Sequence, residues 1–273
     1  MQTPLSPSAA PPDLIPIRRV LVSVFDKTGL DRLAAALKRA GVEVVSTGGT
    51  ANALASHGLT VTDVSAVTGF PEVLDGRVKT LHPHVFAGIL ARADRPDDLA
   101  VLAEHGIGRF DAVIVNLYAF EEAIARPGCL PHEAVELIDI GGPSLVRAAA
   151  KNHAFTAIVT DPEQYDELIS ALEEGGTTLT QRKLLAARAF EHTAAYDAVI
   201  ARWMARHAGL MAGPAAAGPA GEDCDDEPPL PARMTLEIDR RLALRYGENP
   251  HQAAALFAPV GTRRGLAGLK QHA

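Results

Sequence analysis

The chain has 273 residues, of which 47% are hydrophobic and 22% charged, a composition typical of a soluble globular protein long enough to bury a core. The formal net charge of −7 argues against a nucleic-acid-binding surface, which needs a basic face, but allows one nucleotide in a locally basic pocket. The two cysteines lie far apart, and no Cys/His spacing indicates a metal site, so the reducing cytoplasm is the simplest compartment.

The N-terminal residues 1–17 lack a basic segment and a continuous apolar run, so they predict a disordered tail rather than a signal peptide. Residues 18–25 then predict a buried strand, because β-branched and apolar side chains dominate there. No apolar stretch approaches the length needed to span a membrane, so we expect no membrane partner.

The order of strand, polar turn and helix repeats along the chain, which is the pattern of a doubly wound parallel sheet. The first helix carries Leu30, Leu33 and Leu37 on one face and ends at Gly41, and a strand follows at 42–46. The same reading predicts strands at 112–115 and 155–160 and helices at 96–104, 130–138, 143–151, 161–174 and 180–207.

The C-terminal region changes character after this long helix. Residues 208–233 are rich in Ala, Gly, Pro and acidic groups and predict a linker. Residues 234–244 predict one strand, and residues 245–252 form a compact polar motif. The residues that follow are too few to build a core of their own, so we expect the sequence to stop inside a second domain.

Two polar turns, Asp26–Gly29 and Thr47–Thr50, each follow a predicted strand and precede a predicted helix. Free backbone N–H groups and the positive end of a helix favour an anion at such a position. The alternative is that Gly48 and Gly49 only form a tight turn and Thr50 caps the helix. Neither turn matches a known nucleotide fingerprint, so ATP-driven or NAD chemistry has no support.

The loop at 69–84 places Arg77, Lys79 and Thr80 within four residues, among turn-forming residues. Such a loop can present two cations and a hydroxyl to an anionic small molecule. The alternative is a solvated charged loop without a ligand.

The helix at 143–151 carries Ser144, Arg147 and Lys151 on one face. A partly buried Lys151 near other cations would have a lowered pKa and serve in proton transfer, with Asp139 as its partner. The alternatives are that Lys151 only balances the helix dipole and Asp139 only caps the helix.

Asn116 and Tyr118 close the strand at 112–115, where Tyr118 is either a boundary aromatic or a hydrogen-bond donor. His82, His84 and His153 show no ligand spacing and are interpreted as structural or surface groups.

Taken together, several motifs closely resemble the IMP cyclohydrolase domain of the bifunctional AICAR transformylase/IMP cyclohydrolase family. The resemblance covers about residues 18–207 and implies a methylglyoxal-synthase-like, three-layer α/β sandwich with a mainly parallel sheet, in a homodimer. The motifs that carry it are Ser23–Leu30, Ser46–Thr50, Thr68–Pro83, Asn116–Tyr118, Ile138–Gly142 and Arg147–His153.

The resemblance also implies roles for individual residues. The groups that would bind the nucleotide are Lys27, Thr47, Gly48, Gly49, Thr50, Arg77, Val78, Thr80, Asn116, Ile140 and Gly141. The candidate catalytic groups are Lys79, Tyr118, Asp139 and Lys151. The family often has Ser or Tyr where Phe25 stands, so no side-chain hydrogen bond is expected there.

The motif at 245–252 resembles the opening of the transformylase domain, which places the start of that domain at 234–273. The resemblance implies that Arg245 and Tyr246 contact the AICAR substrate of that domain. The family's later Lys-His motif does not occur in these residues, so we expect no formyl transfer from them alone. Formyl-tetrahydrofolate would be the co-substrate of that missing part, whereas the cyclohydrolase needs no cofactor.

The implied activity is the dehydrative ring closure of FAICAR, a formamido-imidazole-carboxamide ribonucleotide, to IMP. This reaction needs two arms of the substrate held together, a donor for the formyl oxygen and an acceptor for the amide proton. Two alternatives remain at this point. One is a lyase of the same fold acting on a triose phosphate, and the other is a non-catalytic nucleotide-sensing module.

Overall fold

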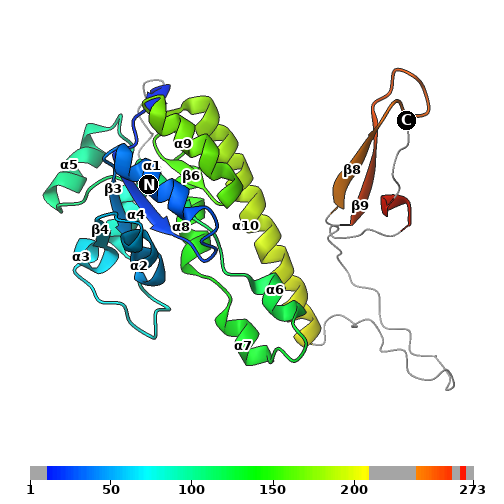
Figure 1. The fold of residues 1–273 in the computed structure, drawn as a ribbon, viewed down its shortest axis with the longest axis horizontal. Helices are drawn as coiled ribbons and strands as arrows, with labels where there is room; N and C mark the ends of the chain where they lie inside the picture. Colours follow the sequence, from blue (N-terminus) through cyan, green and yellow to red (C-terminus); the bar gives the residue numbers. More distant parts are fainter. Residues whose placement is uncertain (1–10, 209–237, 260–264, 269–273) are drawn as a thin grey trace, which may run out of the picture. The chain divides into compact units, whose positions relative to one another are not determined.

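The computed structural model describes residues 11–208, 238–259 and 265–268 and divides into two units (Figure 1). A five-stranded parallel sheet forms the centre of the first unit. The strand order is β4 (Val61–Asp63), β3 (Glu43–Ser46), β2 (Arg19–Ser23), β5 (Ala112–Val115) and β6 (Ala157–Val159). The chain therefore runs outward from β2 to β4 and then returns to the other side of β2 with β5. The order reverses between β2 and β5, and parallel sheets bind ligands outside the carboxyl ends of strands at such a point.

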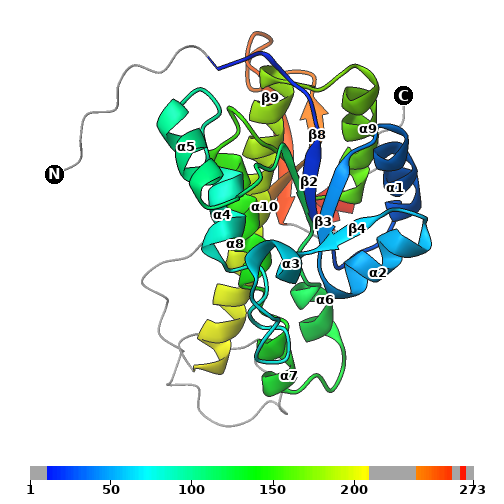
Figure 2. The ribbon, with the colours of Figure 1, turned by 90° about the vertical axis from the view of Figure 1, so that its left-hand side faces the viewer.

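Helices cover both faces of this sheet, as Figure 2 shows. On one face lie α1 (Leu30–Arg39), α2 (Gly48–Ser56) and α9 (Tyr165–Glu173). On the other face α8 (Gly141–Lys151) packs against β5 and β6, and α4 (Pro83–Leu90) packs against α8. This arrangement confirms the predicted three-layer α/β sandwich with a parallel sheet.

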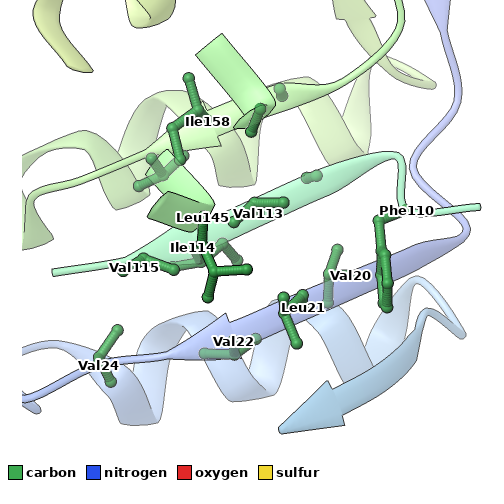
Figure 3. Close-up of a cluster of buried hydrophobic side chains, with 14 of the residues drawn as sticks. Val20, Leu21, Val22, Val24, Phe110, Val113, Ile114, Val115, Leu145 and Ile158 are labelled. Carbon is green, nitrogen blue, oxygen red and sulfur yellow. The ribbon is translucent and has the colours of Figure 1, made fainter. Parts of the chain in front are cut away.

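The core lies between the central strands and the helices above and below them (Figure 3). Val20, Leu21 and Val22 of β2 have no exposed surface, because helices cover both faces of a parallel strand. On α8, Leu145 contributes a side chain that is 1% exposed, next to Ile114 of β5 (Figure 3). The continuous apolar run predicted for the first strand therefore reflects burial on both sides.

The expectation of a disordered tail is wrong for the described part of residues 1–17. The strand β1 (Leu14–Ile15) pairs with β7 (Thr177–Thr178), and Ile15 is 7% exposed. Arg182 anchors this segment, because its guanidinium donates hydrogen bonds to the carbonyl oxygens of Pro12, at 2.8 Å, and Asp13, at 3.1 Å. Residues 1–10 lie outside the described residues.

Two helices in the region between β4 and β5 were not predicted. The helix α3 (Val64–Thr68) begins where the Asp63 carboxylate accepts a hydrogen bond from the Ser65 N–H at 2.8 Å. α4 begins where His82 Nδ1 accepts a hydrogen bond from the His84 N–H at 3.2 Å. These short helices depend on side-chain caps and carry little periodicity, whereas α5 (Pro96–Glu104) was predicted correctly.

Most of the remaining elements of the first unit lie close to their predicted positions, but the helix at 120–125 was not predicted and one predicted helix begins earlier than expected. The helix expected from Pro143 already begins at Gly141, so the proline occupies the first turn of α8. Proline is tolerated there because the first N–H groups of a helix have no partner within it. The other elements are α6 (Phe120–Ala125), α7 (Pro131–Glu136), the 3-10 turn η1 (Pro162–Gln164) and α10 (Leu179–His207).

The second unit comprises residues 204–273 and begins within the last turn of α10. The rest of its described part is an antiparallel hairpin of β8 (Ile238–Leu244) and β9 (Ala254–Pro259), followed by η2 (Gly265–Gly268). The strand expected at 234–244 is confirmed from Ile238 onward, and β9 was not predicted. The linker expected at 208–233 lies outside the described residues after Ala208. Among the helices that the structure describes, none combines the length and the apolar character needed to cross a membrane.

Candidate active site

A pocket of about 600 Å³ lies at the carboxyl ends of the central strands. Ser23, Val24 and Phe25 reach it from the end of β2, Thr47 from the end of β3, and Asn116 from the end of β5. The pocket therefore lies at the point where the strand order reverses, as expected for a parallel sheet. Its size falls in the range of sites that enclose a small molecule.

Two polar side chains of the pocket are used to fix its backbone. The Asn116 side-chain oxygen accepts hydrogen bonds from the N–H groups of Phe25 and Asp26, and its NH2 donates to the Asp26 carbonyl at 2.9 Å. The Thr50 hydroxyl donates to the Val24 carbonyl at 2.9 Å and accepts from the Val24 N–H at 3.2 Å. Both side chains therefore hold the loop after β2 in place.

Positive charge enters the pocket from two loops. Lys27 follows β2, and its Nζ lies 3.3 Å from the Phe25 carbonyl oxygen. Arg77 and Lys79 come from the loop between α3 and α4, where Arg77 pairs with Glu136 at the end of α7. Such cations suit an anionic group of a ligand.

Lys79 is the more sheltered of these cations. Its side chain is 28% exposed, and its Nζ lies 4.0 Å from the Glu72 carboxylate. The charge of Lys79 also acts on Asp139, where it opposes the rise in pKa that burial causes. Lys79 therefore lies within electrostatic reach of a partly buried carboxylate and remains open to the pocket.

Asp139 is that carboxylate, and it lies in the turn between α7 and α8. Burial raises its pKa above the usual value, and the hydrogen bond from the Gly142 N–H and the charge of Lys79 oppose this rise. The Gly142 N–H donates to Asp139 Oδ1 at 2.8 Å. A Cβ atom on Gly142 would lie 2.3 Å from Asp139 Oδ2, so glycine is required for this close approach. A carboxylate with a raised pKa is suited to accept a proton near neutral pH.

Tyr118 supplies a phenol on the same wall. Its pKa is raised, first by burial and then by the negative charges of Asp139 and Glu72. Its ring contacts Phe25 with the centroids 5.5 Å apart, which packs one side of the ring and leaves its hydroxyl as the polar group. Tyr118 is therefore a neutral hydrogen-bond donor next to a carboxylate.

The structure brings most of the predicted site residues into this pocket. They are Lys27, Thr47, Gly49, Thr50, Arg77, Lys79, Thr80, Asn116, Tyr118, Asp139, Ile140 and Gly141. Gly48 and Val78 do not line it, although each lies between residues that do. Val78 instead pairs through its backbone with Val73, which closes the loop that carries Arg77.

The expectation that Lys151 lies in the pocket is wrong. Lys151 is the last residue of α8, is exposed, and does not line the pocket, which lies at the other end of that helix. At 1.5 Å per residue the two ends of α8 are about 15 Å apart. The residues of α8 that line the pocket are Gly141 and Gly142 in its first turn, and none of the face formed by Ser144, Arg147 and Lys151 does.

Several pocket residues were not predicted. They are Ser23, Val24, Phe25, Asp75, Gly76, Val135, Glu136, Ile138 and Gly142. Gly142 adjoins the predicted Gly141, and its pairing with Asp139 was a detectable signal, because a glycine pair after an acidic residue allows close backbone approach. Glu136 gave no such signal, because its partner Arg77 lies 59 residues away.

The second unit holds Arg245 and Tyr246 in the loop after β8. Tyr246 is 51% exposed, and the loop is closed by a hydrogen bond from the Gly247 N–H to the Gln252 carbonyl at 2.9 Å. Within the described residues of both units, no three His, Cys, Asp or Glu side chains gather closely enough to hold a metal ion.

Fold and pocket together define an α/β domain of the methylglyoxal-synthase-like class, and a family model described as "MGS-like domain" matches residues 29–144. A second model, described as "AICARFT/IMPCHase bienzyme", matches residues 149–273. The chain belongs to the AICARFT/IMPCHase bienzyme family, which confirms the resemblance read from the motifs.

Curated relatives cover almost the whole chain. The chain is 52% identical to the bifunctional purine biosynthesis protein PurH of Mycobacterium marinum over 256 residues, which is 94% of this chain and 46% of that protein. It is 53% identical to the PurH of Cutibacterium acnes, with the same coverage. The chain therefore spans about half the length of the curated relatives that it matches. A solved structure described as "Crystal structure of ForH" is 39% identical with a TM-score of 0.61, and the match covers 67% of this chain and 95% of that one.

Proposed function

We propose that the first unit is an IMP cyclohydrolase, which closes the ring of FAICAR to form IMP with loss of water. The observation that carries the proposal is that Asp139, Lys79 and Tyr118 line one pocket at the switch point of the sheet. Membership of a family whose relatives are named as purine biosynthesis proteins supports a purine nucleotide as the ligand.

The phosphate end of the nucleotide would bind at the loops after β2 and β3. Lys27 supplies a positive charge there, and Thr47 and Gly49 lie at the N-terminal end of α2, where N–H groups lack partners within the helix. Arg77 would contribute a second cation once its pairing with Glu136 is loosened. The base would then extend toward the Asp139 turn.

Ring closure would use the groups on that side of the pocket. The carboxamide nitrogen of FAICAR attacks the formyl carbon and loses one proton, while the formyl oxygen takes up a proton and becomes a hydroxyl group. That hydroxyl then takes up a second proton and leaves as water, as the formamido nitrogen loses its proton and the ring C=N bond forms. Lys79 and Tyr118 are placed to donate to that oxygen as its negative charge develops. Asp139, with its raised pKa, is placed to accept the proton that the amide nitrogen loses. Holding the two arms together supplies an entropic advantage of several kcal/mol.

The longer protein would carry a second activity in this proposal. The hairpin of β8 and β9 would begin a transformylase half, in which Arg245 and Tyr246 contact AICAR and formyl-tetrahydrofolate donates the formyl group. The cyclohydrolase itself would use no cofactor and would act in the cytoplasm as a homodimer.

A spectrophotometric assay of IMP formation from FAICAR tests the proposal. We expect Lys79→Met to lower kcat by about 100-fold or more, because one donor to the developing oxyanion is lost. Lys183→Met, which removes an exposed lysine of α10, is the matched control and keeps wild-type turnover. A wild-type protein that binds IMP but forms none from FAICAR would overturn the proposal.

A further inference from the structure

Tyr196, a residue of α10, holds the turn that carries Asp139. Its hydroxyl oxygen accepts a hydrogen bond from the Asp139 N–H at 2.9 Å and donates one to the Leu137 carbonyl at 3.1 Å. The Tyr196 hydroxyl therefore pairs with one backbone group on each side of Ile138. Tyr196 itself does not line the pocket, so it touches the site only through this turn.

The tyrosine ring is fixed by its surroundings. It contacts the ring of Phe120, which is 1% exposed, edge to face with the centroids 6.5 Å apart. Burial raises the pKa of Tyr196 to about 12, so its hydroxyl stays protonated over the physiological range. The phenol therefore keeps both a donor and an acceptor role at working pH.

Asp139 is consequently held from two directions. Its N–H is bound by Tyr196, and its side-chain oxygen Oδ1 is bound by the Gly142 N–H at 2.8 Å. Loss of the hydroxyl would leave the Asp139 N–H and the Leu137 carbonyl without their partner and would free the turn to move. A displacement of about 1 Å in a reacting group can lower a rate by up to about 100-fold.

We propose that Tyr196 is a positioning residue for ring closure, which sets the place of the Asp139 carboxylate from a helix outside the pocket. This inference rests on the proposed cyclohydrolase function. It assigns a task to a part of the chain beyond the matched MGS-like residues 29–144.

Tyr196→Phe in the full chain is the direct test, because it removes the hydroxyl and keeps the ring against Phe120. We expect kcat to fall by about tenfold or more while KM changes by less than about threefold, since the phosphate-binding loops are untouched. Tyr165→Phe is the matched control. Tyr165 is also buried, with a pKa raised to about 12 by burial, but its hydroxyl has no hydrogen-bond partner among the described residues, so kcat stays at the wild-type value.

A double-mutant cycle separates positioning from general loosening of the fold. In single turnovers with enzyme in excess, Tyr196→Phe should lower the rate by less than about twofold when Asp139 is already Asn, because the group that it positions is gone. The acid limb of the kcat–pH profile should also move to lower pH in Tyr196→Phe, because a freer and better hydrated Asp139 loses its proton more readily.

The outcomes are distinguishable. A wild-type protein without turnover refutes the proposed function. Hydrogen exchange then tests only the hydrogen bond between the Asp139 N–H and the Tyr196 hydroxyl, with faster exchange of that N–H expected in Tyr196→Phe. An active wild type with unchanged kcat and pH profile in Tyr196→Phe overturns the positioning role. So does a loss that is fully additive with that of Asp139→Asn. If Tyr196→Phe fails to fold, the same cycle is run with Phe120→Leu, which loosens the packing that fixes the Tyr196 ring. Coupling with Asp139→Asn there supports the role, whereas full additivity refutes it.

Discussion

Arg182 and Asp139 are both ionisable groups withdrawn from solvent, Arg182 completely and Asp139 in part, and their partners differ. All the N–H groups of the Arg182 guanidinium point at carbonyl oxygens, which belong to Pro12, Asp13, His153, Ala154 and Thr177. Asp139 has one oxygen bound by Gly142 and lies against an open pocket with Lys79 nearby.

The difference separates a structural ion from a candidate reactive one. Burial lowers the pKa of Arg182, yet its saturated hydrogen bonds leave no capacity for a ligand. Burial raises the pKa of Asp139, and hydrogen bonds from the Gly142 and Gly141 N–H groups oppose this rise. An ionised carboxylate can accept about four hydrogen bonds, so these two leave capacity for a ligand. In this fold the function of a buried charge follows from its unused hydrogen-bonding capacity, and burial alone does not reveal it.

The largest effect is expected at Arg182. We expect Arg182→Met to lower the free energy of unfolding by about 3 kcal/mol or more, because several buried carbonyls lose their donor. Arg188→Met on the same helix removes only a partly exposed ion pair with Glu167 at 3.1 Å. It should change the free energy of unfolding by less than about 1 kcal/mol. Urea unfolding followed by circular dichroism measures both. Equal losses in the two variants would contradict the structural role of Arg182.

A second prediction concerns the close approach at Gly142. Gly142→Ala would place Cβ 2.3 Å from Asp139 Oδ2 and 2.8 Å from Leu117, so the carboxylate must move, and kcat should fall by about tenfold or more. The Cβ atom of Gly141→Ala would meet only the Thr80 hydroxyl, at 3.0 Å. That hydroxyl can rotate, so kcat should fall less than in Gly142→Ala. Steady-state assays of IMP formation compare the two. A larger loss in Gly141→Ala would show that the Asp139 position is not the limiting feature.

A third prediction uses the raised pKa of Asp139. The folded state holds this proton more tightly than the unfolded state, so stability is lost as pH rises through the folded pKa. Asp139→Asn cannot ionise and should melt a few degrees higher than wild type at pH 7, with the gain vanishing below about pH 4, while ring closure slows to a residual rate. Calorimetry between about pH 4 and pH 7 measures the two melting temperatures. A variant that melts lower than wild type at pH 7 would contradict the sign of the shift.

The smallest effect is expected at the rim of the pocket. Glu136→Gln would release Arg77 from an ion pair in which both side chains are more than half exposed. We expect KM for the nucleotide to fall by about twofold at low salt and the difference to disappear at high salt. Titrations at two salt concentrations test this. A rise in KM would mean that Glu136 itself supports binding.

Features encoded by neighbouring residues were predictable from the sequence. The strands β2, β3, β5 and β6 show apolar runs, and the polar loops that follow them were correctly placed at one edge of the sheet. Motif resemblance added Asp139 and Tyr118, which local pattern alone left ambiguous. Their presence in one pocket follows from the parallel order of the strands.

Features that depend on distant contacts were not predictable. The strand β1 has only two residues and depends on Arg182, about 170 positions along the chain. Tyr196 lies within the helix predicted at 180–207, but its contact with Asp139 spans 57 residues and was not predicted. The prediction for Lys151 was wrong for another reason. Helical periodicity shows which residues share a face, but it does not show which part of the helix meets the pocket.

The helix α10 bears both Arg182 and Tyr196, about 21 Å apart along its axis at 1.5 Å per residue. A truncation that ends before this helix would keep every strand of the central sheet and still lose both attachments together. The shortest fragment worth crystallising with a nucleotide therefore extends past Tyr196, well beyond β6, the last strand of the central sheet in chain order.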